Sequence, residues 1–512
     1  MFNQLFVSCS SACFELENTN PYYSPEKYKV VLNGKTLDEE KDCNVFSLYN
    51  LEPDTEYTVG TTLDNFTLKF RTDKVAATIN VKELGAKGDG VTEDTYYIQK
   101  AIDSCPNGGR VVIPKGSFYT RPIVLKSDLT LEIQKGGELL GDVVEEHYPY
   151  VPAKLDLPDG EDVLATWEGN PHPCHQSFIS AHKQENIKII GEGTINGNAD
   201  HSTWWAKPQG REVARPRLVT LNKCEHAYFH GVTCKNSAAW NLHPFFSENL
   251  GFFDLRVQNP SNAPNTDGLD PESCDKVQII GCIFSVGDDC VALKSGKLYM
   301  GAKYKTPANH HVIRNNFFQD GHGAIVLGSE TSGGVKNLTV NQCVFKHTDR
   351  GLRIKSRRGR GKHCVIDGVV FENIKMINVL TPLVINMYYF CDPDGHTEYV
   401  YTREKLPVDE RTPYLGKFVF RDIECTDCEV MCAYFDGLVE QPIKEIVLEN
   451  ISFSFKADAK PNQPAMLEFV RDYCKEGIYI DNVEKVTLKN VTFEGVEGDN
   501  VIQKNCGKLK IV

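Results

Sequence analysis

The chain has 512 residues and a formal net charge of -13, which argues against nucleic acid or an anionic membrane as a partner because both need a broad basic face. A chain of this length folds either as two or more domains or as one extended repetitive architecture. Its composition, with 40 Gly, 21 Tyr, 26 Phe and only 6 Met, favours a soluble, mostly β protein in which Val, Ile and Thr recur in short runs. No apolar run approaches the roughly 18 residues of a membrane span.

The N-terminus and the cysteines favour an intracellular protein. The first 18 residues carry no Lys or Arg before their short apolar part, which is unlike a secretory signal peptide. The 18 cysteines are scattered, often within apolar strand patterns, as expected for reduced thiols that are buried as small hydrophobes. Cys425, Cys428 and Cys432 form a tight cluster, but no Cys or His pair follows at zinc-finger spacing, so we interpret them as structural thiols. We therefore expect a cytoplasmic location and neither a metal nor another cofactor.

Residues 1–75 are predicted to form a separate small β-sandwich. Short alternating strands are separated there by Pro, Asn, Asp and Gly turns. The segment LEPDTEYTV, at 51–59, resembles the fibronectin type III family, in which that Tyr lies at a corner between a turn and a strand. Because no polar cluster suggests chemistry, we expect a spacer or packing domain rather than a carbohydrate-binding module.

From residue 187 onward a strand-like segment recurs, with apolar residues alternating around a central polar or Gly position. The segments begin at 187, 227, 251, 277, 311, 338, 364, 418, 446 and 486, and the short spacings cluster near 26 residues. Such a strand-rich repeat predicts a right-handed parallel β-helix over residues 80–512. A leucine-rich repeat would need a Leu-based consensus and a propeller would need a longer period.

In a β-helix, adjacent coils stack about 4.8 Å apart, so residues at equal offsets in successive repeats line up on one face. Equal offsets from the repeat starts place His322 beside Asp288 and His243 beside Asp267, with Arg353 near the second pair. Polar residues that are distant in the sequence are thus predicted to form one cluster.

Four tripeptides follow this repeat: NTD at 265–267, GDD at 287–289, GHG at 321–323 and RIK at 353–355. In this order they resemble the four signature motifs of the polygalacturonases, glycoside hydrolase family 28. The resemblance covers about residues 80–512 and is nearest to bacterial exo-acting members, which carry a fibronectin-like N-terminal domain. Many endo-acting members have Gln before the paired aspartates, whereas this chain has Gly287, which argues against endo action.

The three clustered aspartates suit hydrolysis of a glycosidic bond, which needs one carboxylic acid to protonate the leaving oxygen and one carboxylate to activate water. Mutual repulsion should keep one of them protonated while the others are ionised. The resemblance implies Asp288 as the general acid and Asp267 with Asp289 as the base, with inversion of configuration. Neighbouring residues of a regular strand point to opposite faces, so Asp288 and Asp289 can act together only if the backbone bends at Gly287.

Further polar residues are candidates for positioning the substrate. His322 is expected to orient the acid or to tune its charge. Arg353 and Lys355 lie on one face of a strand and suit a galacturonate carboxylate, to which Arg offers a bidentate fork. The basic segment 356–362 follows, and there we assign Arg357 to substrate binding, with Arg358 weighed against an ordinary solvated loop. The remaining predicted substrate contacts are Asn265, Trp240, His243 and Lys294.

The sequence thus predicts a hydrolase of α-1,4-galacturonide bonds whose partner is a pectic oligosaccharide. Exo action is favoured because insertions near 144–185 and 375–417 could wall off one end of the cleft. Three alternatives stay open: a hydrolase of rhamnogalacturonan or xylogalacturonan, a pectate lyase, and a non-catalytic β-helical carbohydrate-binding protein. A lyase would need a calcium site and a base that abstracts a proton next to the uronate carboxylate.

Overall fold

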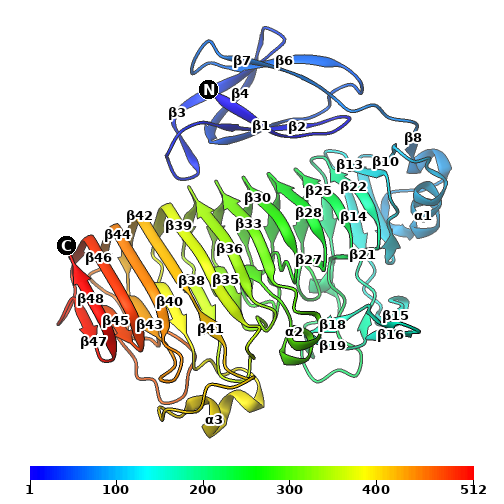
Figure 1. The fold of residues 1–512 in the computed structure, drawn as a ribbon. Coiled ribbons are helices and arrows are strands. Elements are labelled where there is room, and N and C mark those ends of the chain that lie inside the picture. The colour runs from blue at the N-terminus through cyan, green and yellow to red at the C-terminus, as the bar shows by residue number, and fades with distance from the viewer.

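The computed structural model describes all 512 residues and contains two β units (Figure 1). The N-terminal unit consists of two antiparallel sheets, with strand orders β1-β2-β5 and β4-β3-β6-β7, which enclose a core of their own. Its strands are β1 (Phe2–Val7), β2 (Ala12–Leu16), β3 (Tyr23–Leu32), β4 (Lys35–Cys43), β5 (Val45–Leu48), β6 (Glu56–Thr61) and β7 (Thr67–Arg71).

One contact in this unit bears on the predicted corner. The Tyr57 hydroxyl accepts a hydrogen bond from the Glu52 backbone N–H at 2.9 Å. A tyrosine that bonds back to the backbone a few residues upstream is a known corner of β-sandwich domains. The specific likeness to fibronectin type III stays a prediction.

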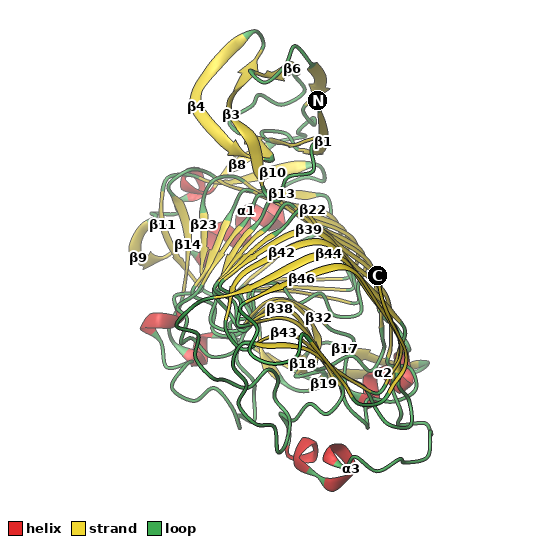
Figure 2. Ribbon diagram, turned by 90° about the vertical axis from the view of Figure 1, so that its left-hand side faces the viewer, coloured by secondary structure: helices red, strands yellow, loops and turns green.

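From residue 78 onward the chain winds into a parallel β-helix, which confirms the predicted fold class; Figure 2 views its coils nearly end-on. Apolar residues stack inward from coil to coil, as where Ile279 pairs with Ile313 and Ile313 with Val340. This stacking explains the repeat, because each coil buries its apolar residues against the next.

The β-helix is dominated by one long sheet of 24 strands. Its strands are β8 (Thr78–Asn80), β9 (Asp89–Glu93), β10 (Gly109–Ile113), β11 (Gly116–Thr120), β13 (Leu129–Ile133), β14 (Gly137–Gly141), β22 (Glu185–Ile190), β23 (Thr194–Asn196), β25 (Glu225–His230), β26 (Thr233–Lys235), β28 (Glu248–Phe253), β29 (Arg256–Gln258), β30 (Asp275–Ile280), β31 (Ile283–Ser285), β33 (Ala308–Arg314), β34 (Phe317–Gln319), β36 (Val335–Asn341), β37 (Val344–Lys346), β39 (Val365–Ile377), β41 (Tyr414–Leu415), β42 (Lys417–Cys428), β44 (Ile443–Phe455), β46 (Val483–Glu494) and β48 (Cys506–Ile511).

A second face of the β-helix is formed by two smaller parallel sheets. One contains β12 (Ile123–Val124), β21 (Ile179–His182), β24 (Val219–Asn222) and β27 (Leu242–Phe245). The other contains β32 (Asp289–Leu293), β35 (Gly323–Gly328), β38 (Arg350–Lys355), β40 (Thr381–Asn386), β43 (Met431–Asp436), β45 (Glu476–Asp481) and β47 (Val501–Gln503). Residue Leu269 bridges the two sheets, because it pairs with Leu242 on one side and with Val291 on the other.

The remaining elements are short. Three two-stranded hairpins lie in the insertion near 144–185: β15 (Tyr150–Val151) with β20 (Cys174–His175), β16 (Lys154–Leu157) with β17 (Gly160–Val163), and β18 (Thr166–Trp167) with β19 (Asn170–Pro171). The helices are α1 (Thr95–Ser104), α2 (Leu298–Tyr304) and α3 (Glu398–Tyr401), with single 3₁₀ turns at Val81–Leu84, Glu145–His147, Ala199–His201 and Pro393–His396. None of these helices has the length and apolarity needed to cross a membrane.

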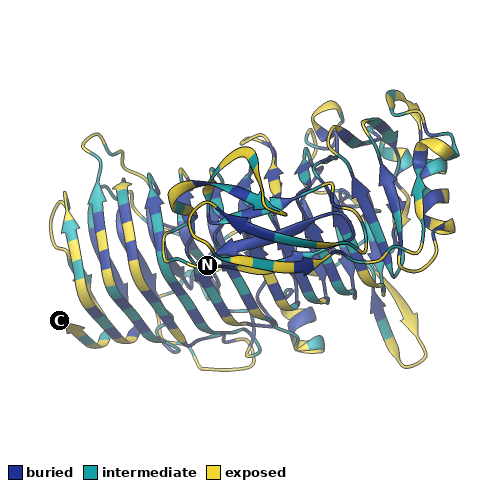
Figure 3. Ribbon diagram, turned by 90° about the horizontal axis from the view of Figure 1, so that it is seen from above, coloured by how far each residue is buried: buried dark blue, intermediate teal, exposed yellow.

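The N-terminal sandwich packs on the long sheet, over the middle of the β-helix (Figure 3). Phe6 lies in an apolar cluster with Phe253 and Ile280 of that sheet. At the edge of the contact, the Arg314 guanidinium donates to the Glu15 carboxylate at 2.7 Å. The hairpins, α2 and α3 lie on the opposite side of the β-helix (Figure 1).

All 18 cysteines are free, and most of them are buried. Cys425, Cys428 and Cys432 lie in the main apolar core, where they pack as the structural thiols that the sequence predicts.

Candidate active site

The four motifs come together on the second face of the β-helix, near the junction of its two sheets. Asp289 pairs with Gly323 in the ladder between β32 and β35, so Asp288 and His322 lie side by side as predicted. The predicted pairing of His243 with Asp267 is wrong: Leu242 pairs with Leu269, which places His243 beside Asp270. The turn that follows β29 is longer than the one that follows β26, and this difference shifts the register.

The carboxylates of Asp267, Asp288 and Asp289 form one cluster in which the nearest oxygens all lie within 4.8 Å of one another. Asp267 and Asp289 are buried, whereas Asp288 is partly exposed. The backbone bends at Gly287 and Asp288 before β32 begins, as the sequence predicts. A Cβ on Gly287 would lie 2.4 Å from the Ala263 carbonyl oxygen, so only glycine fits at this position.

Two cations hold Asp289 in its ionised form. Lys355 Nζ donates to Oδ2 at 2.6 Å and Arg353 Nη1 donates to Oδ1 at 3.1 Å. Burial by itself would raise the pKa of Asp289, but the charges of Lys355 and Arg353 outweigh burial and lower it below its usual range.

Asp267 has the opposite environment. Burial, and then the nearby charges of Asp270 and Asp288, raise its pKa well above the usual range. Lys294 lies 3.9 Å from Asp267 and 3.1 Å from Glu330; burial disfavours its charge, yet Glu330, Asp270 and Asp267 raise its pKa well above the usual value. In the free protein the proton that these carboxyl groups retain therefore resides away from Asp289.

The cluster of three carboxylates has the spacing of a metal site. Oxygen ligands of this kind suit Ca²⁺ or Mg²⁺. Lys294, Arg353 and Lys355 already neutralise these carboxylates, so a divalent cation would have to compete with three fixed positive charges.

His322 is held beside Asp288 by its backbone. Its backbone N–H donates to the Asp288 carbonyl oxygen at 3.0 Å. The ring is half exposed, and its Nδ1 lies 3.5 Å from Asp349 Oδ2. Gly321 adopts a φ of +94°, and a Cβ there would lie 2.7 Å from the Asp288 carbonyl oxygen, which explains the glycine before His322.

These groups line a cavity of about 220 Å³, here called the catalytic cavity. Nine of the eleven predicted site residues line it: Trp240, Asn265, Asp267, Asp288, Asp289, Lys294, His322, Arg353 and Lys355. Its other lining residues are Glu168, Ser329, Glu330, Tyr389, Cys391, Asp392 and Met466.

Trp240 and Asn265 are fixed by neighbouring cations. Lys294 Nζ lies over the Trp240 ring at 4.7 Å from the centroid. The Asn265 side-chain oxygen accepts a hydrogen bond from Arg215 Nη2 at 2.5 Å. Both residues thus present preoriented surfaces to the catalytic cavity.

The prediction that Arg357 binds substrate is wrong. Its side chain is buried and donates through Nη2 to Asp392 at 3.1 Å and to Asp394 at 2.9 Å. Arg358 is likewise buried, with Nε 2.6 Å from Glu440 and Nη1 donating to the Thr402 carbonyl oxygen of the insertion at 2.7 Å. The insertion near 375–417 covers this basic segment, so the two arginines anchor that insertion and do not face the catalytic cavity.

His243 also lies elsewhere than predicted. It is 3% exposed, its Nε2 lies 2.9 Å from Glu272 Oε2, and it lines a separate cavity behind Trp240. The prediction failed because the shifted register carries His243 away from Asp267.

Sequence reasoning missed the residues that the two insertions bring to the cavity. Lys297 links both insertions, because its Nζ lies 3.1 Å from Asp392 and 3.9 Å from Glu168. Neither Asp392 nor Glu168 belongs to a repeat or a motif, so no sequence pattern predicts that these two carboxylates reach the cavity. Glu330 could have been found from the coil register, since Gly296 pairs with Thr331.

A parallel β-helix that gathers three carboxylates in a cavity on one face suits an enzyme that hydrolyses glycosidic bonds, because paired carboxyl groups can supply the acid and the base of that hydrolysis. Residues 124–402 match the family model described as glycosyl hydrolases family 28, and residues 78–146 match one described as rhamnogalacturonase A/epimerase, pectate lyase-like. The chain belongs to glycosyl hydrolases family 28 and is a glycoside hydrolase.

Among curated proteins, the chain is 32% identical over 422 residues to an exo-poly-alpha-D-galacturonosidase of Dickeya chrysanthemi, covering 74% of this chain and 68% of that protein. It is 34% identical over 319 residues to an endo-polygalacturonase of Pectobacterium carotovorum subsp. carotovorum, covering 59% of this chain and 74% of that protein. Among solved structures, the family 28 exopolygalacturonase of Yersinia enterocolitica aligns with a TM-score of 0.76 at 22% identity, covering 100% of this chain and 98% of that one. This last match shows a shared fold along the whole chain.

Proposed function

We propose that this protein hydrolyses α-1,4-galacturonide bonds of pectic oligosaccharides or polygalacturonate from one end of the chain. The observation that carries the proposal is the catalytic cavity, where three carboxylates lie among fixed cations in a protein of net charge -13. An acidic protein needs such local positive charge to hold an anionic sugar. Lys355 uses one of its three N–H donors on Asp289 and has two left for a uronate carboxylate.

In the proposed mechanism Asp288 protonates the leaving oxygen. Among the three aspartates it is the one that is not buried, so it can reach a substrate in the cavity. Asp267 and Asp289 hold the attacking water, and Asp289 is kept ionised by Lys355 and Arg353. Burial keeps a proton on Asp267 in the free protein. Because the nearest oxygens of the three aspartates lie within 4.8 Å of one another, this proton is available to Asp288 when substrate binds.

Inversion of configuration is part of the proposal, although the short spacing is a point against it. In general, inverting enzymes separate their two carboxyl groups by about 6.5–9.5 Å and retaining ones by about 5–5.5 Å. Here both oxygens of Asp289 are already occupied, by Lys355 and Arg353, which makes this carboxylate a poor nucleophile. A water held between Asp289 and Asp267 is the better attacking group.

Exo action is supported by the way the insertions close the cavity. The catalytic cavity continues into an adjoining one of about 280 Å³, since Glu168, Cys391 and Asp392 line both. The adjoining cavity is walled by Trp167 and by Arg215, whose guanidinium lies 5.3 Å from the centre of the Trp167 ring. A chain end that enters the adjoining cavity and stops at the Trp167 wall would place the first or second glycosidic bond at Asp288, giving mono- or digalacturonate.

The names of the relatives agree on galacturonan as the substrate but divide between exo and endo action. The Dickeya chrysanthemi and Yersinia enterocolitica proteins are described as exo-acting and the Pectobacterium protein as endo-acting, all on galacturonan. The 18 free cysteines also support the proposal that this enzyme works in a reducing compartment.

The proposal is tested by measuring reducing ends, viscosity and ultraviolet absorbance over time in polygalacturonate solutions to which the purified protein is added. An exo-hydrolase releases reducing ends long before the viscosity falls, is insensitive to EDTA, and forms no unsaturated, ultraviolet-absorbing product. An early fall in viscosity would contradict exo action. An EDTA-sensitive, ultraviolet-absorbing product would contradict hydrolysis.

A further inference from the structure

A further cavity, of about 450 Å³, lies on the second face of the β-helix, over β43 and β45. We call it the distal cavity. Tyr434 of β43 and Tyr479 of β45 line it, together with part of the segment 456–475 that joins β44 to β45. This segment, here called the third insertion, lies on the same side of the β-helix as α3 (Figure 1).

The distal cavity lies in line with the catalytic cavity along the β-helix. Arg353 pairs with Val384, Val384 with Tyr434, and Tyr434 with Tyr479. Coils stack about 4.8 Å apart, so Tyr479 lies about 14 Å beyond Arg353 on the same face. Arg215 of the adjoining cavity comes from an earlier coil, before β24. A sugar chain whose end enters the adjoining cavity would therefore leave the catalytic cavity toward the distal one.

The third insertion borders both cavities. Met466 lines the catalytic cavity and Leu467, the next residue, lines the distal cavity. The insertion is fixed by Arg350, whose Nε donates to the Pro464 carbonyl oxygen at 2.7 Å, and by Asn386, whose side-chain N–H donates to the Met466 carbonyl oxygen at 2.9 Å. A chain that leaves the catalytic cavity across Met466 reaches the distal cavity next.

Phe469 of the third insertion lines the distal cavity and is 85% exposed. Its φ is +60°, a left-handed conformation that is costly for a bulky side chain and that is typical of sites which contact ligands. The Tyr401 ring packs edge-on against the Phe469 ring, with the ring centres 5.3 Å apart. The protein thus holds an aromatic ring in water, where the apolar C–H face of a sugar ring can pack on it.

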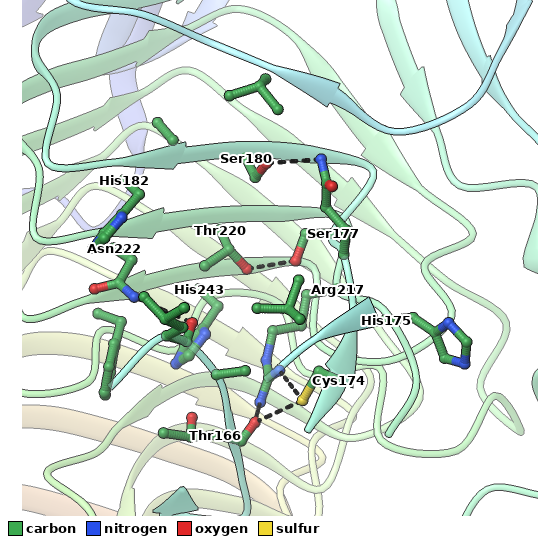
Figure 4. Close-up of a pocket in the computed structure, with 17 residues that line it drawn as sticks. Thr166, Cys174, His175, Ser177, Ser180, His182, Arg217, Thr220, Asn222 and His243 are labelled. Carbon is green, nitrogen blue, oxygen red and sulfur yellow. Dashed lines mark hydrogen bonds between the residues drawn. The ribbon is translucent and has the colours of Figure 1, made fainter. Parts of the chain in front are cut away.

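The cations of the distal cavity are open to a ligand, unlike the arginine in the cavity around His243 (Figure 4). There Arg217 is 4% exposed and donates to the Thr166 carbonyl oxygen. In the distal cavity the side chains of Arg403 and Arg471 are 45% and 63% exposed. An anion in the distal cavity can therefore contact both guanidinium groups.

Both arginines keep donors for such an anion. Arg403 uses two N–H donors on the Asp436 carboxylate. Arg471 uses two, one on Glu476 and one on a backbone carbonyl oxygen. Since a guanidinium has five N–H donors, three remain on each. These ion pairs fix the two guanidinium groups, so a carboxylate would meet donors that are already oriented.

Lys504 adds a cation that is not paired with a carboxylate. Its Nζ lies over the Tyr479 ring, 5.2 Å from the centroid, and its side chain is exposed. The acidic side chains that line the distal cavity have partners of their own, because Glu468 bonds to His396 and Asp481 accepts a hydrogen bond from the Tyr479 hydroxyl. The charge of Lys504 is thus available to an anionic ligand.

We propose that the distal cavity is a second binding site for the galacturonan chain whose end lies in the catalytic cavity. Carboxylates of the chain contact Arg403, Arg471 and Lys504, and one sugar ring packs on Phe469. The identity of the ligand rests on the proposed function, since the chain is the substrate of the catalytic site. One chain that occupies both sites binds more tightly than a chain that occupies one, because the second contact is intramolecular.

Isothermal titration calorimetry tests the proposal, with Asp288→Asn as the parent protein so that the ligands are cleaved slowly. Phe469→Asn removes the ring and keeps a residue that tolerates positive φ, and Lys504→Gln removes a charge without leaving a carboxylate unpaired. The variant with both changes is expected to bind decagalacturonate about tenfold more weakly than the parent. Trigalacturonate, which is too short to reach both cavities, is expected to bind both proteins equally.

The matched control changes an exposed aromatic residue and its cation elsewhere. Lys100 Nζ lies 5.7 Å from the centre of the Tyr96 ring on α1, at the opposite end of the β-helix (Figure 1). Tyr96→Asn with Lys100→Gln is expected to leave the affinity for both ligands unchanged. Melting temperatures of all variants show that each is folded.

Unchanged affinity of the Phe469→Asn, Lys504→Gln variant for decagalacturonate would overturn the proposal. Equal weakening for trigalacturonate would also overturn it, since the two residues would then act on the catalytic cavity. A loss confined to decagalacturonate would support the distal site even if the wild type failed to cleave galacturonan. Cleavage by the wild type without any effect of chain length on binding would leave the proposed function standing and remove the distal site.

Discussion

Replacing Lys355 by Met tests how the catalytic carboxylates are held. Lys355 Nζ lies 2.6 Å from Asp289 Oδ2, and the two side chains are 9% and 1% exposed. At an effective dielectric constant of 20 the Coulomb attraction at this distance is about 6 kcal/mol. Desolvation offsets much of it, and breaking one partner of a buried pair costs about 3–5 kcal/mol. We expect a loss of that size in the free energy of unfolding near neutral pH.

The loss should depend on pH in a definite direction. Asp289 has a lowered pKa in the folded protein, so its ion pairs stabilise the fold above the unfolded value of about 3.9 and lose that effect as the pH falls through the folded pKa. Without Lys355 the pKa of Asp289 should rise by about 1–3 units. The variant then takes up its proton at a higher pH, and the stability deficit shrinks on acidification.

Urea unfolding of the wild type, Lys355→Met, Asp289→Asn and the double variant between pH 2 and 7.5 measures this, because the deficit should shrink mainly below about pH 4. In the double variant the buried charge is gone, so its loss in unfolding free energy should be smaller than the sum of the losses in the two single variants. A deficit that stays constant over this pH range, or strictly additive losses, would refute the reasoning.

Three further predictions concern activity. His322→Gln, which keeps a polar side chain beside Asp349, should lower kcat and reshape the pH profile with little change in KM; a change in KM alone would indicate a binding role. Trp167→Ala should open the wall of the adjoining cavity and lengthen the products, and unchanged mono- or digalacturonate would show that the wall lies elsewhere. Proton NMR of the first turnover should show the β-anomer, formed by inversion; the α-anomer would show retention and would make one aspartate the nucleophile.

The sequence predicted the catalytic cluster because its residues obey the repeat. GDD, GHG and RIK lie at the starts or within the strands β32, β35 and β38, and a parallel ladder turns equal offsets into neighbours. Asp288 and His322 were placed correctly for this reason. His243 was misplaced because a longer turn after β29 shifted the register, and a strand pattern carries no information on turn length.

What the sequence could not predict comes from the insertions. Glu168 and Asp392 reach the cavity from segments without periodicity, and Lys297 joins them. Arg357 belongs to a segment with the composition of a solvated basic loop, yet its side chain is buried and pairs with Asp392 and Asp394. Such contacts depend on how two long insertions fold against each other, which neither local propensity nor the repeat determines.

The most direct test of the central account is the first product formed from hexagalacturonate labelled at its reducing end, compared between the wild type and Asp288→Asn. The account predicts that the wild type releases mono- or digalacturonate first, all of it labelled or all of it unlabelled according to the end that is attacked, and that the variant folds normally but loses about 10²–10⁴ in rate, as expected when a general acid is removed. Labelled fragments of several lengths from the outset, or full activity in Asp288→Asn, would contradict it.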